Sequence, residues 1–452
     1  MKIVGLITEY NPFHNGHLYH IRKSKELTGA DYCIALMSGS YVQRGAPAIY
    51  DKYVRASMAL SSGADLVLEM PVAFSTASAR EFATYGVALF TALGAVDSIC
   101  FGSECGDIAP LSRIAGLLAD EPEEFSRTLK ECLKQGMTYP EARHQALLSS
   151  LTPDEQAVLA SPNNILGIEY IRAGMALGSP LRFHTIRREG QAYHDTAVLS
   201  GIGNPDRCLA SASAIRRIVA SGQNPPGPSA SQDLPASLDL PGSLDFPGSL
   251  GLPDSPETVT TDSLSSMVPA CVHRMISREQ PVFSDDFSSI LNYRILKGDW
   301  TGIADLTPEL DARIRKSALS PVSFEERIQE LKTRQLTYTR VSRALLHLIL
   351  NLHESDVGLY KENGYAPYAR VLGFRKDSLP LLSALKRSSV VPLITKLADA
   401  GKLLDGTALS MLGQEIEAAH IYQMIRASKG GTFRNEYTQG VIVCGTGSEC
   451  SP

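Results

Sequence analysis

Residues 3–20 read IVGLITEYNPFHNGHLYH, and this stretch decides the fold. The apolar run from Ile3 to Ile7 predicts a short buried strand, because it is too short for a helix. The Asn11-Pro12 pair then ends the strand, since proline forces the residue before it into an extended or turn geometry. A pattern of helical spacing follows. The stretch is therefore predicted to pass from a strand to a helix through a tight turn.

Two histidines, His14 and His17, lie in this turn, at the carboxyl end of the first predicted strand. Ligands bind at this edge of open α/β sheets, and the helix that follows offers backbone N–H groups to an anion. Two imidazoles can donate hydrogen bonds to a triphosphate, and Gly16 lets the backbone approach the ligand closely. We therefore interpret the turn as a phosphate-binding loop.

Two other interpretations of the turn remain open from the residues alone. His14, His17 and His20 could be metal ligands, but no acidic or cysteine partner follows at a metal-binding spacing. The histidines could also do no more than satisfy the hydrogen bonds of the turn.

Short apolar runs alternate with helical patterns up to residue 220, which is typical of a parallel α/β sheet. After the first strand, further strands are predicted at residues 32–37, 65–70, 95–103 and 183–186. Helices are predicted at residues 51–62 and 76–93, and residues 109–160 are expected to form a mainly helical excursion above the sheet.

The composition changes at residues 221–262, where units such as Leu240-Pro-Gly-Ser-Leu-Asp repeat every six residues. Proline in each unit forbids a helix, and the run has too little apolar surface to offset the entropy of ordering. We predict a disordered linker; a β-helix is the alternative, although the four units are few for that architecture.

Residues 263–440 are predicted to form a mainly helical domain, and residues 441–452 a flexible tail. Apolar residues at helical spacing predict helices at 263–278, 287–297, 309–317, 323–331, 339–352, 379–386, 391–400 and 411–426.

Polar motifs follow two other predicted strands. Gly102 ends a strand in Phe101-Gly102-Ser103-Glu104, where a ligand could approach the backbone. Asn163 and Asn164 open a predicted helix, where a side-chain amide could cap the helix or read a base edge. Capping is the expected role of one of them, which leaves the other to be explained. Arg187 and Arg188 follow a strand, where two guanidinium groups can clamp a phosphate.

The segment 332–343, KTRQLTYTRVSR, stands out among the predicted helices. It holds four basic side chains and no acid, together with threonines and a tyrosine. Such a mixture can grip a phosphate backbone and stack a base, although a solvated basic helix start has the same composition. The segments 365–370 and 374–376 also combine aromatic and basic residues, which is again only suggestive of RNA binding.

The overall composition restricts the function further. A formal net charge of −5 on 452 residues gives no general nucleic-acid signature, so any RNA contact depends on local basic patches. The eight cysteines match neither a zinc spacing nor a disulfide framework, so reduced thiols are expected. With no signal-peptide pattern and no run of about 18 apolar residues, a cytoplasmic protein without a membrane partner is expected.

The longer motifs of the chain are EYNPFHNGHLYH, SGSYVQRG, FGSE, PNNILGIEY, TIRR with the later YHD, SASAIR and LTYTRVSRALLHLIL. Together they resemble the tRNA(Met) cytidine acetate ligase family of the HxGH nucleotidyltransferase superfamily. SASAIR, at residues 211–216, resembles the second superfamily signature. The resemblance covers residues 1–220 well and 263–440 more loosely. It implies a Rossmann-like (HUP-type) parallel-sheet nucleotidyltransferase domain followed by a mainly helical tRNA-binding domain.

The resemblance implies a two-step reaction. ATP, accompanied by Mg²⁺, and acetate would give acetyl-adenylate and pyrophosphate, and the acetyl group would then pass to N4 of the wobble cytidine of elongator tRNA(Met). One alternative is a small-molecule adenylyltransferase without an RNA substrate, which the long helical region disfavours. Another is a non-catalytic nucleotide-binding or RNA-binding protein, which the intact set of His14, His17 and Arg188 disfavours.

The resemblance also assigns residues by position. His14 and His17 would be the catalytic residues that act on the phosphates. The ATP site would be lined by Ile7, Thr8, Glu9, Tyr10, Asn11, Pro12, Phe13, His14, Asn15, Gly16, His17, Leu18, Tyr19 and His20, and by Gly102, Asn163, Arg188, Ser211, Ser213 and Arg216. The tRNA-binding surface would include Lys332, Arg334, Tyr338, Arg340 and Arg343. No residue is assigned as a metal ligand, and the sequence gives no oligomeric state.

Overall fold

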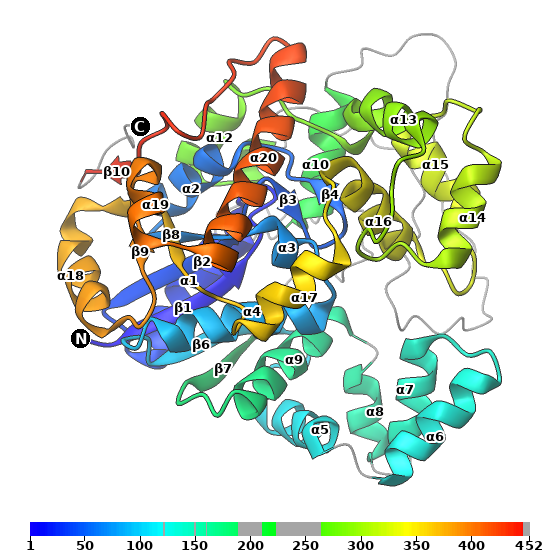
Figure 1. The fold of residues 1–452 in the computed structure, drawn as a ribbon. Coiled ribbons are helices and arrows are strands. Elements are labelled where there is room, and N and C mark those ends of the chain that lie inside the picture. Colours follow the sequence, from blue (N-terminus) through cyan, green and yellow to red (C-terminus); the bar gives the residue numbers. More distant parts are fainter. Residues whose placement is uncertain (121–122, 149–150, 160, 189–209, 223–263, 446–452) are drawn as a thin grey trace.

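The computed structural model describes residues 1–120, 123–148, 151–159, 161–188, 210–222 and 264–445 (Figure 1). The segment predicted as a linker lies outside these ranges, apart from residues 221–222, and so does the YHD motif at residues 193–195. No helix within the described ranges is both long enough and apolar enough to cross a bilayer.

A mainly parallel sheet of eight described strands lies at the centre of the molecule. Its five parallel strands from the first half stand in the order β5-β2-β1-β6-β7, close to the predicted strand positions. These strands are β1 (Ile3–Thr8), β2 (Tyr32–Ser38), β5 (Leu66–Met70), β6 (Ser98–Ser103) and β7 (Arg182–Arg187). The strand order reverses at β1, so the carboxyl ends of β1 and β6 form the switch point at which such sheets bind ligands.

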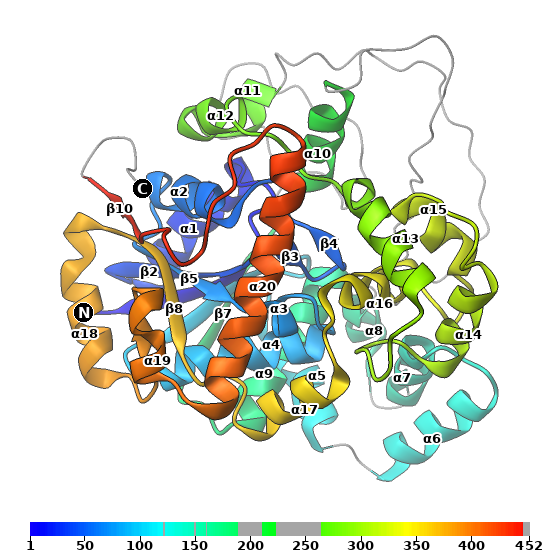
Figure 2. The same cartoon turned by 45° about the horizontal axis from the view of Figure 1, so that its top comes forward.

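Side chains of successive strand residues point to opposite faces of the sheet, and helices cover both faces. Val4 and Leu6 pack on one side with α1 (Asn15–Thr28), α2 (Lys52–Ser61) and α12 (Ala270–Ile276). Ile3 packs on the other side, in a core shared with α4 (Ala79–Ala92), α9 (Pro162–Ala176), α18 (Leu379–Ser388) and α20 (Gly406–Ser428). Figure 2 shows the layers, with α2 and α12 above the sheet and α4 and α9 below it.

Three strands from the second half complete the sheet, which corrects several predictions. β8 (Ala369–Arg375) pairs antiparallel with β5, and β9 (Leu393–Ile394) and β10 (Ile442–Cys444) pair with β8. The helix predicted at residues 391–400 is therefore wrong in its first part, and residues 369–370 and 374–375 of the two aromatic and basic segments lie in β8. The tail predicted from residue 441 begins with a paired strand. Short apolar runs do not distinguish a strand from a helix by periodicity, which explains these errors.

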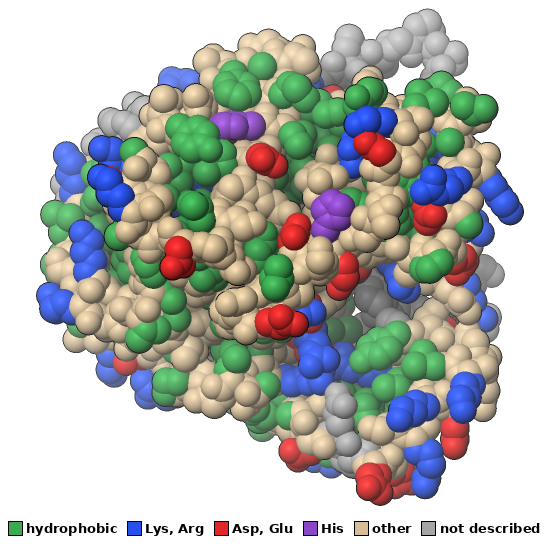
Figure 3. Space-filling model, in the orientation of Figure 1, with side chains coloured by type: hydrophobic (Ala, Val, Ile, Leu, Met, Phe, Trp, Pro, Cys, Tyr) green, Lys and Arg blue, Asp and Glu red, His purple; other side chains and the backbone are tan. Residues whose placement is uncertain are grey.

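Two helical lobes stand beside the sheet. The excursion predicted between β6 and β7 consists of α5 (Ile108–Asp120), α6 (Glu123–Lys134), α7 (Tyr139–Leu147) and α8 (Pro153–Leu159). The second lobe consists of α13 (Ser288–Lys297), α14 (Pro308–Lys316), α15 (Phe324–Leu331) and α16 (Tyr338–Leu350). Its apolar core also includes Tyr41, Val72 and residues of α20. In the space-filling view the molecule is hollowed between the lobes (Figure 3).

Shorter elements connect these parts. They are β3 (Tyr41–Val42), β4 (Ala46–Pro47), α3 (Val72–Ser75), α10 (Ala212–Ser221), α11 (Leu264–Met267), α17 (Glu354–Glu362), α19 (Ala400–Leu403), and the 3₁₀ turns Ser284–Phe287, Lys376–Ser378 and Leu397–Asp399. The helix predicted at residues 263–278 is two helices, α11 and α12, because Pro269 interrupts it.

A buried ion cluster joins the two halves of the chain. Lys52 Nζ on α2 lies 2.6 Å from Glu69, 3.0 Å from Glu436 and 3.5 Å from Glu415, and Arg370 on β8 lies 2.8 Å from Glu69 and 2.6 Å from Glu436. Burial and the charge of Glu69 raise the pKa of Glu415 well above its usual value, which favours its protonated form. With Glu415 protonated, two cations balance two carboxylates. The halves share one sheet and this cluster, so the boundary predicted at residue 220 does not separate two independent cores.

The cysteines depart from the expected state at one position. Cys33, Cys100, Cys105, Cys132 and Cys271 are free thiols, whereas Cys444 at the end of β10 is disulfide-bonded. Spacing in the sequence does not show which thiols approach within bonding distance.

Candidate active site

The turn after β1 is held in place by hydrogen bonds to its backbone. Arg55 of α2, which is fully buried, donates to the carbonyl oxygens of Glu9 at 2.6 Å and Ser38 at 3.1 Å. The side-chain oxygen of Asn11 accepts a hydrogen bond from the backbone N–H of Ile49 at 2.7 Å. The ends of β1 and β2 are thereby fixed to α2, so the turn is formed before any ligand binds.

Each histidine of the HxGH motif uses one ring nitrogen to build the turn. His14 is the N-cap of α1, and its Nδ1 accepts a hydrogen bond from the Gly16 N–H at 3.0 Å. Nδ1 of His17 accepts from the His14 N–H at 3.3 Å, and the two rings stack with their centroids 3.8 Å apart. An accepting nitrogen of a neutral imidazole carries no proton, so the proton of each ring is on Nε2. Both rings therefore keep one N–H donor for a ligand.

Gly16 is required by this arrangement. A Cβ atom at Gly16 would lie 2.8 Å from Cε1 of His14, closer than packed atoms allow. A side chain at this position would therefore displace the capping imidazole.

The imidazoles are held neutral. Burial, followed by the charges of Arg188 and Arg216, lowers the pKa of His14 to about 3. Burial and the neighbouring His14 lower the pKa of His17 well below its ordinary value, and burial with Arg188 lowers that of His20 to about 4. The rings consequently act as neutral hydrogen-bond donors, while the positive charge at the site comes from the two arginines.

A second group of predicted residues meets at the ends of β6 and β7. The Glu104 carboxylate accepts hydrogen bonds from Asn163 Nδ2 at 2.6 Å and from the Asn164 N–H at 3.0 Å, so Glu104 caps α9. The prediction that an asparagine caps this helix is wrong. Arg188 Nη1 donates to Asn163 Oδ1 at 3.2 Å, and a Cβ atom at Gly102 would lie 3.3 Å from Arg188 Cγ. Gly102, Asn163 and Arg188 thus lie together.

The SASAIR segment reaches the same turn from a distant part of the chain. Ser211 caps α10 by accepting from the Ala214 N–H at 3.2 Å. Arg216 donates to the carbonyl oxygen of Asn11 at 2.7 Å and to Ser213 Oγ at 3.0 Å. The second predicted signature therefore contacts the first, which places a guanidinium group beside the histidines.

The other predicted residues of the HxGH segment differ in their access to a ligand. Tyr10 and Phe13 are fully buried and pack against the His17 ring, so they can contact a ligand only through their backbone. Asn15 donates to the carbonyl oxygen of Ser266 at 2.9 Å. Thr8, Asn11, Pro12 and His14 are also buried, whereas Ile7, Glu9, Asn15, Gly16, His17, Leu18, Tyr19 and His20 are partly exposed.

A short hairpin, β3–β4, adds two residues that the sequence interpretation did not single out. The backbone N–H of Gln43 donates to the Glu9 carboxylate at 2.8 Å. Arg44, the next residue, is partly buried. Burial lowers the pKa of its guanidinium group, whereas the charges of Glu9 and Tyr338 raise it. The signal was the motif SGSYVQRG at residues 38–45, which contributed only to the family resemblance.

The predicted tRNA-binding residues run along one edge of the second lobe. Arg334 is exposed and lies 3.2 Å from Glu141 of α7, which links the two lobes. Arg343 pairs with Asp305 at 2.9 Å, whereas Arg340 is exposed. Lys332 and Tyr338 are partly exposed, and the Tyr338 hydroxyl donates to Glu325.

The hairpin connects this edge to the ATP site. Ser342 Oγ of α16 donates to the carbonyl oxygen of Gly45 at 2.9 Å. Since Gln43 in the same hairpin contacts Glu9, one short connection joins the HxGH turn to α16.

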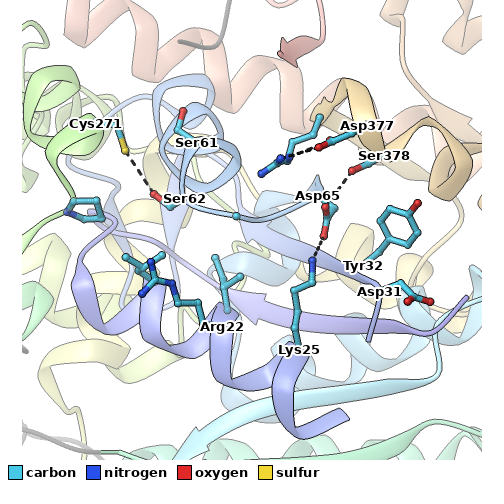
Figure 4. A pocket seen from close by; sticks show the side chains of 15 residues that line it. Arg22, Lys25, Asp31, Tyr32, Ser61, Ser62, Asp65, Cys271, Asp377 and Ser378 are labelled. Atoms are coloured by element: carbon cyan, nitrogen blue, oxygen red, sulfur yellow. Dashed lines mark hydrogen bonds and ion pairs between the residues drawn. The ribbon is translucent and has the colours of Figure 1, made fainter. Parts of the chain in front are cut away.

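A separate cavity of about 750 Å³ lies at the other edge of the sheet (Figure 4). Four of its charged side chains form two pairs: Lys25 with Asp65 at 3.0 Å, and Arg375 with Asp377 at 2.8 Å. The cavity lies beside the amino ends of β2 and β5, and Leu18 of the HxGH segment also lines it. No group of three histidine, cysteine or acidic side chains in the described ranges is placed to hold a metal ion.

Comparisons with known proteins agree with this geometry. The family described as HIGH Nucleotidyl Transferase matches residues 1–436. A tRNA(Met) cytidine acetate ligase of Acetivibrio thermocellus is 35% identical over 451 residues, covering 98% of this chain and 100% of that protein. One of a Thermoanaerobacter species is 36% identical over 426 residues, covering 94% and 95% of the two chains.

Solved structures give the same result. Crystal structures of Thermotoga maritima TmcAL, one bound with alpha-thio ATP and one apo, superpose with TM-scores of 0.82 and 0.83 at 28% identity. Each covers 99% of this chain and 100% of the other. With its paired imidazoles at the switch point of such a sheet, the chain belongs to the HIGH nucleotidyl transferase family and, within it, to the tRNA(Met) cytidine acetate ligases.

Proposed function

We propose that this protein is an ATP-dependent ligase that activates acetate as acetyl-adenylate and transfers the acetyl group to N4 of the wobble cytidine of elongator tRNA(Met). The observation that carries the proposal is the HxGH turn, where two neutral imidazoles with N–H donors lie beside Arg188 and Arg216. The names of the relatives supply the acceptor, tRNA(Met), and the acyl group, acetate. A tRNA substrate implies a cytoplasmic location.

In the first step an acetate oxygen attacks the α-phosphorus of ATP and pyrophosphate leaves. Negative charge grows on the departing phosphates, so donors fixed in advance at that position lower the barrier most. His14 and His17 offer Nε2–H donors, Arg216 faces the turn from α10, and Arg188 lies on the β6–β7 side. We assign the outer phosphates to His14, His17, Ser211, Ser213 and Arg216, and the nucleotide to Gly102, Asn163 and Arg188.

Mg²⁺ is expected to arrive with ATP. This ion is commonly held by the substrate phosphates and water together with one or two carboxylates. Glu9 at the turn accepts one hydrogen bond from Gln43, and Glu104 on the β6–β7 side accepts two from the start of α9. Nothing in their geometry singles out either carboxylate as an Mg²⁺ ligand, so we assign none.

In the second step the tRNA must bring its wobble base to the acetyl group. The exposed guanidinium of Arg340, together with Lys332 and Arg334, lies along the edge of the second lobe, which the β3–β4 hairpin links to the ATP site. We propose that this edge binds the tRNA backbone, whose phosphates attract lysine and arginine.

The decisive experiment is the mass analysis of tRNA nucleosides after incubation of the enzyme with ATP, labelled acetate and elongator tRNA(Met). Labelled N4-acetylcytidine at the wobble position is expected only when all three are present. Acetate-dependent pyrophosphate release without acetylcytidine would instead support the alternative, a small-molecule adenylyltransferase.

A further inference from the structure

The β3–β4 hairpin places a carboxylate and a guanidinium group at the border between the ATP site and α16. Glu9 is the residue after β1, and its carboxylate accepts from the Gln43 N–H at 2.8 Å. Arg44 follows Gln43, and its guanidinium group lies within the electrostatic reach of Glu9, Arg216 and Tyr338. The pair therefore lies between the HxGH turn, which we assign to ATP, and α16, which we assign to the tRNA-binding edge.

We propose that Arg44 and Glu9 read the Watson–Crick edge of the acceptor cytosine, and that Glu9 accepts the proton that N4 loses during acetyl transfer. This inference rests on the proposed function.

The chemistry of the pair matches cytosine and not uracil. Cytosine presents an exocyclic amine donor at N4 beside acceptors at ring N3 and at O2. A carboxylate accepts from the amine, as acidic side chains do at cytosine N4, and a guanidinium group donates to the two acceptors. Uracil has an acceptor where cytosine has its amine and a donor at ring N3. The contacts at these two positions would be lost, Arg44 would keep only the acceptor at O2, and Glu9 would face an oxygen.

The transfer step balances with Glu9 as the base. The N4 lone pair attacks the acetyl carbonyl carbon, the new C–N bond forms, and the bond between that carbon and the phosphate oxygen breaks. AMP leaves with the bonding electron pair, and the N4 proton passes to the Glu9 carboxylate. No oxidant or further reactant is required.

The other carboxylate of the site is committed elsewhere. Glu104 accepts from Asn163 Nδ2 at 2.6 Å and from the Asn164 N–H at 3.0 Å, which ties it to the start of α9. Glu104 belongs to the β6–β7 side, away from the hairpin and α16, so it serves as the matched control.

The test compares two full-length elongator tRNA(Met) transcripts that differ only in a cytidine or a uridine at the wobble position. The ratio of their dissociation constants is measured for the intact enzyme by titration with labelled tRNA. The wild type is expected to prefer cytidine by about tenfold or more. Arg44→Lys keeps the charge but loses the forked donor geometry, and Glu9→Gln keeps the shape but no longer offers only acceptors. Each variant is expected to lower the ratio to within about twofold of unity.

A kinetic comparison distinguishes the role of Glu9 as proton acceptor from a purely structural role. In Glu9→Gln, single-turnover acetyl transfer is expected to fall about 100-fold relative to acetate-dependent ATP–pyrophosphate exchange. Glu104→Gln is expected to raise the KM for ATP and to retain the wild-type base preference. Retention of the wild-type ratio by Arg44→Lys or by Glu9→Gln, or equal losses of transfer and exchange in Glu9→Gln, would overturn the proposal. A wild type that forms no acetylcytidine at all would instead remove the proposed function.

Discussion

Each imidazole of the HxGH turn has a different task for each of its nitrogens. Nδ1 of His14 and of His17 accepts a backbone hydrogen bond, which leaves Nε2–H as the donor for a phosphate. The same hydrogen bonds that fold the turn therefore select the tautomer that the chemistry needs. A capping serine or asparagine would serve the fold as well, but it would not reach a phosphate in this way.

Asparagine and glutamine at position 14 separate the two tasks. His14→Asn keeps an acceptor at the cap and should change the free energy of unfolding by less than about 0.5 kcal/mol, yet lower acetate-dependent pyrophosphate release about 100-fold or more. His14→Gln keeps a donor near the Nε2 position but loses the cap, so it should cost about 1 kcal/mol of stability. Urea unfolding and pyrophosphate release check both. A rate for His14→Asn within tenfold of the wild type would contradict the donor role.

The lowered pKa of His14 makes stability depend on pH in a defined direction. The folded protein binds the His14 proton only near pH 3, whereas the unfolded chain binds it below about 6.5. The unfolded state thus takes up more protons as the pH falls, and stability is lost between about pH 6.5 and 3. Between pH 6.5 and 5 this amounts to about 1.5 kcal/mol. His14→Asn should reduce the slope of unfolding free energy against pH in this window, and parallel curves would contradict the shift.

At this scale the motifs identify residues that the fold brings together, such as Gly102, Asn163 and Arg188, but not the contacts that hold them. The roles of these residues toward ATP stay predictions. The motifs do not single out Arg44 or the capping role of Glu104, since both depend on contacts between segments far apart in the chain.

At the scale of elements, the β3–β4 hairpin is the part that connects the two substrate sites. Gly45 has φ of +76°, and a Cβ atom there would lie 2.4 Å from the backbone nitrogen of Arg343. The hairpin therefore rests directly on the backbone of α16, and any side chain at position 45 would push the two apart.

Gly298 provides the matched control for this contact. Its φ of +70° is similar, but no atom lies within 4 Å of a Cβ built there. Gly298→Ala should cost only the backbone strain, about 1 kcal/mol, whereas Gly45→Ala should cost about 2 kcal/mol more and weaken tRNA acetylation. Thermal or urea unfolding of the two variants measures the difference. Equal costs would show that the hairpin does not need its close approach to α16.

The sequence predicted the strands and helices of the first half well, but it did not predict β8, β9 and β10, which complete the sheet. Strands such as β1 and β2 are continuous apolar runs bounded by turn residues, so pattern alone identifies them. β8 was not identified, because its pairing with β5 joins positions about 300 residues apart and no local pattern contains that information.

At the scale of the whole molecule, the buried ion cluster fixes the second half of the chain to the first. Lys52 and Glu69 come from the first half, whereas Arg370, Glu415 and Glu436 come from the second. A buried charge is costly when its partner is removed, because the remaining charge cannot reach water. The cluster is therefore expected to make the two halves unfold together.

Two substitutions test this account. Lys52→Met leaves two buried carboxylates with one cation and should cost about 3–5 kcal/mol of stability. The raised pKa of Glu415 favours its neutral form, and Glu415 accepts the Val72 N–H at 2.6 Å, a contact that glutamine can keep, so Glu415→Gln should cost less than about 1 kcal/mol. Urea unfolding of the full chain, followed by tyrosine fluorescence, distinguishes them. A Glu415→Gln variant as unstable as Lys52→Met would mean that Glu415 is ionised.

The central claim is that the HxGH turn and its two arginines present the α-phosphorus of ATP to acetate. Acetate labelled with ¹⁸O in both oxygens tests it directly, because the attacking oxygen stays on the phosphorus that it attacks. After turnover with tRNA(Met), mass analysis should find one ¹⁸O atom in AMP and none in pyrophosphate. Label in orthophosphate, with ADP as the nucleotide product, would show attack at the outermost phosphorus and contradict the account.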